Sequence, residues 1–223
     1  MATLFLFDLD GTLAAVPAGR RAFVKAFAEL AGVPDADRGI HFAGRTDMAL
    51  FREVIRTRGL DLTPEEVAPV YLRHLAEEVA RDSGRVYPGV PELLEALSAW
   101  PGVYLALGTG NLEAGARLKL APHGLNRYFP VGGFGSDAED RPELIRVGIA
   151  RARAYYGVSF DRVVVVGDTP LDVDCGKANG AVTVAVAQSR YSVAALREAG
   201  ADITLPDLAD LDRTLAALRP WVA

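Results

Sequence analysis

The order of apolar and polar positions divides the chain into a helical stretch near its start and a longer stretch in which strands and helices alternate. The mostly apolar run Thr3–Phe7 leads directly into Asp8, Asp10 and a glycine, which is typical of a buried central strand that ends in a turn. Further strands are predicted at Val103–Leu107, Val131–Phe134, Val163–Val166, Val182–Val186 and, as a short edge strand, at Ile203. Valine-rich strands that alternate with helices predict an α/β fold with a parallel sheet covered on both faces.

Residues 15–83 carry helical periodicity without a strand pattern. The expected helices of this segment are one through Phe23, Phe27 and Leu30, one at Met48–Arg58, and one from a capping box at Thr63 to about Asp82. Later helices are expected at Pro91–Ala99 and after Asn111. Further helices are expected from the Arg141-Pro142 pair to about Tyr155, from the turn at Asp172 to Asn179, and at the C-terminal end. The pattern therefore predicts a core domain of residues 1–14 and 84–223, with an inserted all-helical domain of residues 15–83.

Composition narrows the function classes. The 223 residues are 50% hydrophobic and 24% charged, and the net charge is −5, which disfavours unspecific binding to nucleic acid or to an anionic membrane. No apolar run has the length of a membrane span, and Asp8 lies too early for a signal peptide. The single cysteine, Cys175, is expected to be a small buried apolar residue and fits a cytoplasmic location.

Polar side chains follow three of the predicted strands. They are Asp8 and Asp10, Thr109 and Asn111, and Asp168 and Asp172. Because the carboxyl ends of parallel strands open onto one edge of the sheet, we expect these groups to meet there. Carboxylates brought that close require neutralisation, and a divalent cation with oxygen ligands is the usual means.

Simpler interpretations exist for each residue taken alone. Thr109 could be a turn hydroxyl, Asp172 could belong to a capping box with Thr169, Asn111 could cap the following helix, and Arg141 could be a solvated residue at a helix start. Polar turns at three strand ends that meet at one edge would be three unrelated coincidences, which is far less plausible than a single site.

Three other motifs fail on spacing. A calcium loop counted from Asp8 would place Leu13 and Gly19 where glycine and glutamate are needed. The glycines beginning at Gly108 would place Glu113 at the third glycine of a dinucleotide fingerprint, and Gly176-Lys177 lacks the upstream glycine of a phosphate loop.

The motifs resemble those of the haloacid dehalogenase superfamily of phosphohydrolases, over essentially the whole chain. The matching segments are Asp8-Leu9-Asp10-Gly11-Thr12, Thr109-Gly110-Asn111 and Gly167-Asp168-Thr169-Pro170-Leu171-Asp172, as the first, second and fourth motifs. The third motif usually has lysine, and here Arg141-Pro142 stands in its place, which keeps the charge but changes its geometry. The resemblance implies a Rossmann-like sheet with an inserted helical C1 cap at residues 15–83.

The resemblance also implies a Mg²⁺-dependent phosphatase that acts on a small phosphomonoester. Asp8 would be the nucleophile that becomes phosphorylated, and Asp10 would act as general acid and then general base, oriented by Thr12. Mg²⁺ would be held by Asp8, the backbone carbonyl of Asp10 and Asp168, with Asp172 acting indirectly through water. The remaining groups, expected to bind or balance the phosphate, are Arg141, the Thr109 hydroxyl, Asn111, and the backbone N–H groups of Leu9 and Gly110.

The helical insertion is expected to close over the site on hinges near residues 14–18 and 84–90. Arg45 is the predicted cap contact to the substrate, with Arg20 and Arg21 behind it. Phosphoglycolate, a sugar phosphate or a nucleotide monophosphate would all suit such a cap. A monomer and a homodimer both remain open.

Four alternatives to the phosphatase differ from it in the residues or the reaction that they require. A dehalogenase would lack Asp10, and a phosphonate hydrolase would need a cap lysine, for which Lys25 is placed opposite the apolar stripe. A phosphomutase of the β-phosphoglucomutase type uses the same core residues and stays open. A non-catalytic protein that binds a phosphorylated metabolite is disfavoured because every acid that the chemistry requires is present.

Overall fold

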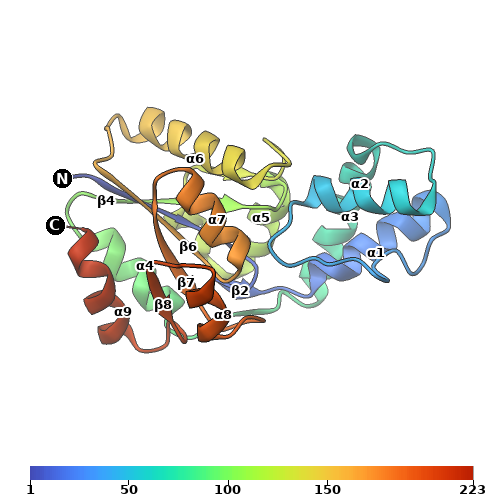
Figure 1. Ribbon diagram of the computed structural model, residues 1–223. Helices are drawn as coiled ribbons and strands as arrows, with labels where there is room; N and C mark the ends of the chain where they lie inside the picture. Colours follow the sequence, from blue (N-terminus) through green and yellow to red (C-terminus); the bar gives the residue numbers. More distant parts are fainter. Residues whose placement is uncertain (223) are drawn as a thin grey trace.

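The computed structural model describes residues 1–222, which form a larger and a smaller lobe (Figure 1). The strands are β1 (Thr3–Phe7), β2 (Ala14–Ala15), β3 (Arg85–Val86), β4 (Val103–Thr109), β5 (Gly132–Phe134), β6 (Arg162–Gly167), β7 (Val182–Val186) and β8 (Ile203–Leu205). The α-helices are α1 (Ala18–Ala31), α2 (Asp47–Arg58), α3 (Pro64–Arg81), α4 (Val90–Ala99), α5 (Glu113–Leu120), α6 (Arg141–Tyr156), α7 (Pro170–Ala178), α8 (Val193–Glu198) and α9 (Leu211–Leu218). Short 3₁₀ helices, which the sequence pattern did not predict, lie at Ala121–His123, Leu125–Tyr128 and Arg219–Trp221.

The larger lobe is built on a six-stranded parallel sheet in the order β5-β4-β1-β6-β7-β8. The first strand lies in the middle, where Thr3 is paired with Val103 of β4 on one side and with Arg162 of β6 on the other. This confirms the predicted α/β class and Rossmann-like core. It also brings the carboxyl ends of β1, β4 and β6 next to one another.

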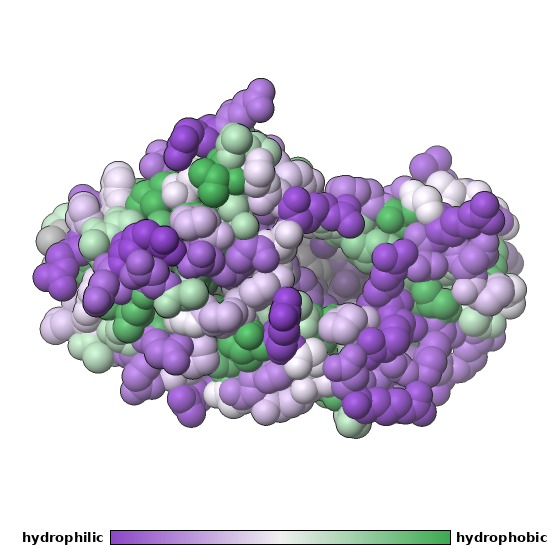
Figure 2. Space-filling view, turned by 90° about the horizontal axis from the view of Figure 1, so that it is seen from below, coloured by the Kyte–Doolittle hydropathy of each residue, from purple (hydrophilic) through white to green (hydrophobic). Residues whose placement is uncertain are grey.

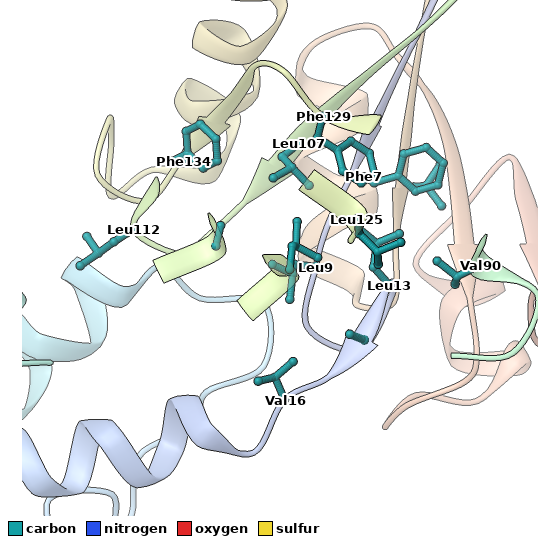
Figure 3. Close-up of a cluster of buried hydrophobic side chains, with 14 of the residues drawn as sticks. Phe7, Leu9, Leu13, Val16, Val90, Leu107, Leu112, Leu125, Phe129 and Phe134 are labelled. Carbon is teal, nitrogen blue, oxygen red and sulfur yellow. The ribbon is translucent and has the colours of Figure 1, made fainter. Parts of the chain in front are cut away.

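The alternating side chains of β1 connect the sheet to two layers of helices. Leu4 and Leu6 belong to a buried cluster with Ile145 of α6, whereas Phe5 and Phe7 belong to a larger cluster on the opposite face. In that larger cluster the ring of Phe7 packs 5.9 Å from the ring of Phe129 (Figure 3). The sheet is therefore buried on both faces, as its valine-rich strands predict.

The smaller lobe consists of α1, α2 and α3 (Figure 1). Its interior is aromatic, with ring centroids 5.1 Å apart for Phe23 and Phe27 and 5.3 Å apart for Phe51 and Tyr71. The predicted capping box at Thr63 is confirmed, since its hydroxyl and the Glu66 side chain bond to each other's backbone N–H. None of the helices in residues 1–222 has both the length and the apolar character that a membrane span requires.

Two short strands connect the lobes. The segments at β2 and β3 pair antiparallel, Ala14 with Val86 and Ala15 with Arg85, so that the chain leaves and re-enters the core at one point. Gly84 has φ +73°, and a Cβ there would lie 2.1 Å from the carbonyl oxygen of Ala15. This close approach requires glycine next to the paired strands.

Candidate active site

Polar side chains from the ends of the central strands line a cavity of about 540 Å³ between the two lobes. The hollow between the lobes is visible on one face of the molecule (Figure 2). The core contributes Asp8 and Asp10 after β1, Thr109 at the end of β4 and Asp168 after β6. The strand order therefore brings together groups from three strands that the sequence places about 60–160 residues apart.

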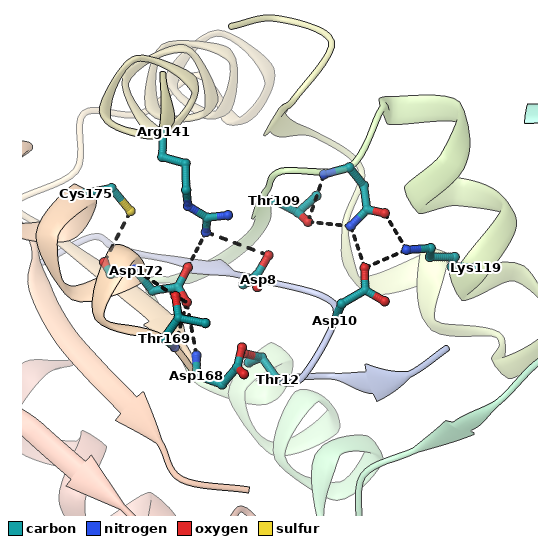
Figure 4. A network of polar contacts seen from close by, with 11 residues as sticks. Asp8, Asp10, Thr12, Thr109, Lys119, Arg141, Asp168, Thr169, Asp172 and Cys175 are labelled. Atoms are coloured by element: carbon teal, nitrogen blue, oxygen red, sulfur yellow. Dashed lines mark hydrogen bonds and ion pairs between the residues drawn. The ribbon is translucent and has the colours of Figure 1, made fainter. Parts of the chain in front are cut away.

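Three buried carboxylates form an acidic cluster, defined here as Asp8, Asp168 and Asp172. Each offers an oxygen, and these oxygens lie within 4.8 Å of one another. The guanidinium of Arg141 at the start of α6 lies 3.9 Å from Asp8 and is hydrogen bonded to Asp172 (Figure 4). One cation thus faces three carboxylates in a region from which water is largely excluded.

The charge imbalance of the acidic cluster changes its protonation. Burial, together with the nearby charge of Asp172, raises the pKa of Asp8 well above its ordinary value, although Arg141 opposes the shift. Burial and Asp172 also raise the pKa of Asp168 to about 7. Burial opposes the charge of Arg141, but Asp172 and Asp8 raise the pKa of its guanidinium, so it stays charged. A divalent cation would supply the missing positive charge, and oxygen donors at this spacing fit Mg²⁺.

Asp172 combines two roles. Its Oδ2 accepts hydrogen bonds from the backbone N–H and the hydroxyl of Thr169, at 2.9 and 2.7 Å, so the simpler capping-box interpretation is confirmed. Its Oδ1 accepts a hydrogen bond from Arg141. Both oxygens are engaged, which suits the indirect role that the sequence predicted for this residue.

The turn after β1 brings Asp168 close to the backbone. Gly11 has φ +92°, and a Cβ there would lie 2.3 Å from Oδ2 of Asp168. Thr12 donates its hydroxyl to Oδ1 of Asp168 at 3.3 Å, so the predicted contact to Asp10 is wrong. Ser189, which the pattern of strand ends does not predict, donates its hydroxyl to Oδ2 of Asp168. Thr12 and Ser189 therefore orient an acid of the cluster.

Asp10 is held by residues of a different element. Its Oδ2 accepts hydrogen bonds from the Lys119 ammonium at 2.6 Å and from the Asn111 amide at 2.8 Å (Figure 4). The predicted helix cap at Asn111 is wrong, because α5 has Leu112 at its N-cap position and the Asn111 side chain bonds Asp10, Lys119 and Thr109 instead. The sequence pattern also did not predict Lys119 as a residue of this site. The structure buries Lys119 on the same face of α5 as Gly115, which its position in the sequence does not indicate.

The predicted cap arginines are placed differently from one another. Arg45 and Arg20 line the cavity, where Arg45 is paired with Glu53, and Arg20 with Asp37 at 2.7 Å. Arg21 is instead paired with Glu78 at 2.6 Å inside the smaller lobe and is not among the described residues that line the cavity. Gly110 lines the cavity as expected, and the side chain of Leu9 is buried in the core.

The start of α2 is bonded directly to the loop after β4. The backbone N–H of Asp47 donates to the carbonyl of Gly110, and its carboxylate accepts from the N–H of Leu112, both at 2.8 Å. Burial raises the pKa of Asp47 to about 6, and the Lys119 charge opposes the shift. These bonds place the backbone of Arg45 against the loop that follows Thr109, where a Cβ on Gly110 would lie 2.3 Å from the carbonyl oxygen of Arg45.

Comparisons with known proteins agree with this arrangement. Residues 2–180 match the family model described as a haloacid dehalogenase-like hydrolase. A phosphoglycolate phosphatase from Rhodospirillum rubrum is 31% identical over 228 residues, which cover 96% of this chain and 91% of that protein.

Other relatives carry different names. The tyrosine-protein kinase PtkA of Mycobacterium tuberculosis is 33% identical over 189 residues, covering 82% of this chain and 61% of PtkA, so the match spans about three fifths of that relative. The crystal structure of CbbY from Rhodobacter sphaeroides in complex with phosphate aligns with TM-score 0.72 at 21% identity, covering 95% of this chain and 96% of that chain. That likeness concerns the fold.

Proposed function

The chain belongs to the haloacid dehalogenase-like hydrolases, and we propose that it is a phosphatase, which hydrolyses a small phosphorylated metabolite in a Mg²⁺-dependent reaction through an aspartyl-phosphate on Asp8. The substrate is proposed to be phosphoglycolate-like or a sugar phosphate. One observation carries the proposal: Asp8 lines the cavity beside Asp168, Asp172 and Arg141, where a nucleophile, a cation and a metal site would all reach one phosphoryl group.

The chain's own groups prepare Asp8 for attack. Asp8 must be ionised, and Arg141 stabilises its carboxylate at 3.9 Å against the burial and the neighbouring acids that raise its pKa. Mg²⁺ held by Asp8, the carbonyl of Asp10 and Asp168, with Asp172 acting indirectly, would neutralise charge on these carboxylates and on the phosphate. Thr109, with backbone N–H groups of Leu9 and Gly110, is proposed to bind the remaining phosphate oxygens.

In the first step a carboxylate oxygen of Asp8 forms a bond to phosphorus, and the bond from phosphorus to the leaving oxygen breaks. Asp10 donates its proton to that oxygen, which leaves as an alcohol. In the second step Asp10 takes a proton from water, and the water oxygen attacks phosphorus. The bond to Asp8 breaks, and inorganic phosphate is released with both acids restored.

The smaller lobe is proposed to act as the cap that closes the cavity and selects the substrate. Arg45 and Arg20 line its inner side and would contact an anionic or hydroxyl-bearing leaving group. The paired strands β2 and β3 lie where the hinges were predicted. The division into residues 1–14 and 84–223 and residues 15–83 remains part of this proposal, as does a cytoplasmic location.

The experiment is a hydrolysis assay on a panel of phosphorylated metabolites. The protein is first freed of metal with a chelator and then assayed with and without Mg²⁺, measuring released phosphate. The proposal expects Mg²⁺-dependent release from at least one small phosphomonoester and none from Asp8→Asn.

Product analysis with the same panel shows whether the phosphoryl group is transferred to an acceptor other than water. Isomerisation of a sugar phosphate without phosphate release would favour a phosphomutase, and transfer to a protein tyrosine would favour the activity after which the PtkA relatives are named. Either result without hydrolysis would contradict the proposed function.

A further inference from the structure

Lys119 is a buried cation that the reaction described so far does not use. The chain has only three lysines, and this one lies on the buried face of α5 with a side chain 5% exposed. Lysine is almost never buried to this extent unless it is paired. Its partners should therefore show what it does.

The ammonium of Lys119 completes a triangle of side chains. It donates to Oδ2 of Asp10 and to Oδ1 of Asn111, each at 2.6 Å, while the Asn111 amide donates to Oδ2 of Asp10 at 2.8 Å. The same amide donates to the Thr109 hydroxyl at 2.9 Å. The triangle thus links Asp10 to Thr109, the residue proposed to bind the phosphate.

The triangle leaves Asp10 with one engaged and one open oxygen. Both donors bond Oδ2, and within residues 1–222 no hydrogen bond engages Oδ1. The Asp10 side chain is 41% exposed and lines the cavity. Fixing Oδ2 with two donors removes the rotational freedom of the carboxyl group, so Oδ1 is held ready for the leaving oxygen.

The smaller lobe covers the ammonium. A Cβ on Gly19 of α1 would lie 3.0 Å from Nζ of Lys119, and Tyr71 of α3 reaches the same spot. With these elements over it, the ammonium is shielded from water, and an ion pair is stronger at a lower effective dielectric constant. The orientation of Asp10 is therefore firmest when α1 and α3 cover the cavity.

We propose that Lys119 is a positioning residue for the phosphatase reaction, which holds Asp10 toward the leaving oxygen and does so most strongly when the smaller lobe is closed. This inference rests on the proposed role of Asp10 as general acid and base. Lys119 acts through Asp10 and makes no bond to the reacting atoms.

The test is a double-mutant cycle on Lys119→Met and Asp10→Asn, with kcat and KM measured separately. Lys177→Met is the matched control, because it removes an exposed lysine whose amine bonds the carbonyl of Ala199. Two substrates are compared: p-nitrophenyl phosphate, whose leaving group needs little protonation, and the best alkyl phosphate of the panel.

Lys119→Met should lower kcat for the alkyl phosphate about 10²-fold and for p-nitrophenyl phosphate less than about tenfold, with KM nearly unchanged. In the Asp10→Asn background the same substitution should change kcat by less than about twofold. Lys119→Arg, which keeps the charge, should recover part of the loss. If thermal unfolding shows that Lys119→Met is not folded, Lys119→Arg replaces it in the double-mutant cycle.

A rise in KM at constant kcat, an equal loss with both substrates, or a full effect in the Asp10→Asn background would overturn the inference. If Asp10→Asn alone leaves kcat unchanged, the proposed role of Asp10 fails instead. The two failures are thus told apart by one set of variants.

Discussion

The two ends of the cavity solve the same electrostatic problem in different ways. At one end the acidic cluster has three buried carboxylates and a single arginine. At the other end Asp10 has the Lys119 ammonium and the Asn111 amide on one oxygen. The chain supplies its own counter-charge for the residue proposed to move protons, and leaves the acidic cluster in need of an external cation. We therefore expect the metal at the acidic cluster, and we expect the side chain of Asp10 to need none.

The largest effect should come from the nucleophile itself. Asp8→Asn should lower kcat at least roughly 10⁴-fold, because an amide cannot form the aspartyl-phosphate. Stopped assays of phosphate release with Mg²⁺ measure this. Activity close to that of the unaltered protein would remove Asp8 from the mechanism.

Asp10→Asn should have the next largest effect. The expected fall in kcat is roughly 10²–10⁴-fold, the usual contribution of general acid–base catalysis. Mg²⁺ binding, followed by calorimetry, should persist in this variant, since its backbone carbonyl is unchanged. Loss of Mg²⁺ binding would show that the two ends of the cavity are not separate.

Asp168→Asn tests the acidic end by a readout other than activity. Mg²⁺ at about 100 times its dissociation constant should raise the melting temperature of the unaltered protein by roughly 5–10 °C. The substitution should abolish most of this shift. Asp174→Asn, at an exposed acid on the following helix α7, is the control and should keep the shift. An unchanged shift in Asp168→Asn would place the metal elsewhere.

Arg45→Ala should act on substrate binding. Loss of a charge-assisted hydrogen bond should raise KM about tenfold for the physiological substrate and leave kcat nearly unchanged. Arg56→Ala, at an exposed arginine near the end of α2, the helix that follows Arg45, should leave KM as it is. An unaltered KM in Arg45→Ala would exclude this residue from the site.

The smallest effect concerns stability and pH. Because burial and Asp172 raise the pKa of Asp168 from 3.8 to about 7, the folded protein keeps a proton that the unfolded chain has lost. The stabilisation from this group is present below pH 3.8 and is lost as the pH rises through about 7. Urea unfolding of the metal-free protein should show this fall.

Mg²⁺ should reduce that fall, because it favours the ionised acids of the cluster. Burial also raises the pKa of Asp47, to about 6, so its contribution falls with pH in the same direction. Asp47→Asn should remove its part of the slope with or without Mg²⁺. A slope that Mg²⁺ leaves unchanged would argue against a metal at the acidic cluster.

The sequence predicted the acidic end of the cavity well. Asp8 and Asp168 each follow an apolar strand, and in a parallel sheet the ends of neighbouring strands must meet. The capping box at Asp172 was likewise readable from local spacing. These are consequences of strand order and of short-range hydrogen bonding.

The other end of the cavity was harder to predict. Lys119 lies in a helix where a lysine is ordinarily solvated, and only the packing of α1 and α3 over α5 buries it. The hydrogen bonds from Thr12 to Asp168 and from Asn111 to Asp10 depend on which carboxylate lies nearer in the folded chain. Tertiary geometry decides such side-chain partners, and no periodicity encodes them.

A crystal structure with Mg²⁺ and beryllium trifluoride, a mimic of the aspartyl-phosphate, tests the central claim most directly. We expect beryllium bonded to a carboxylate oxygen of Asp8, and one ion within about 2.0–2.1 Å of oxygens of Asp8 and Asp168. Beryllium on another residue, or an ion bound away from the acidic cluster, would contradict the account.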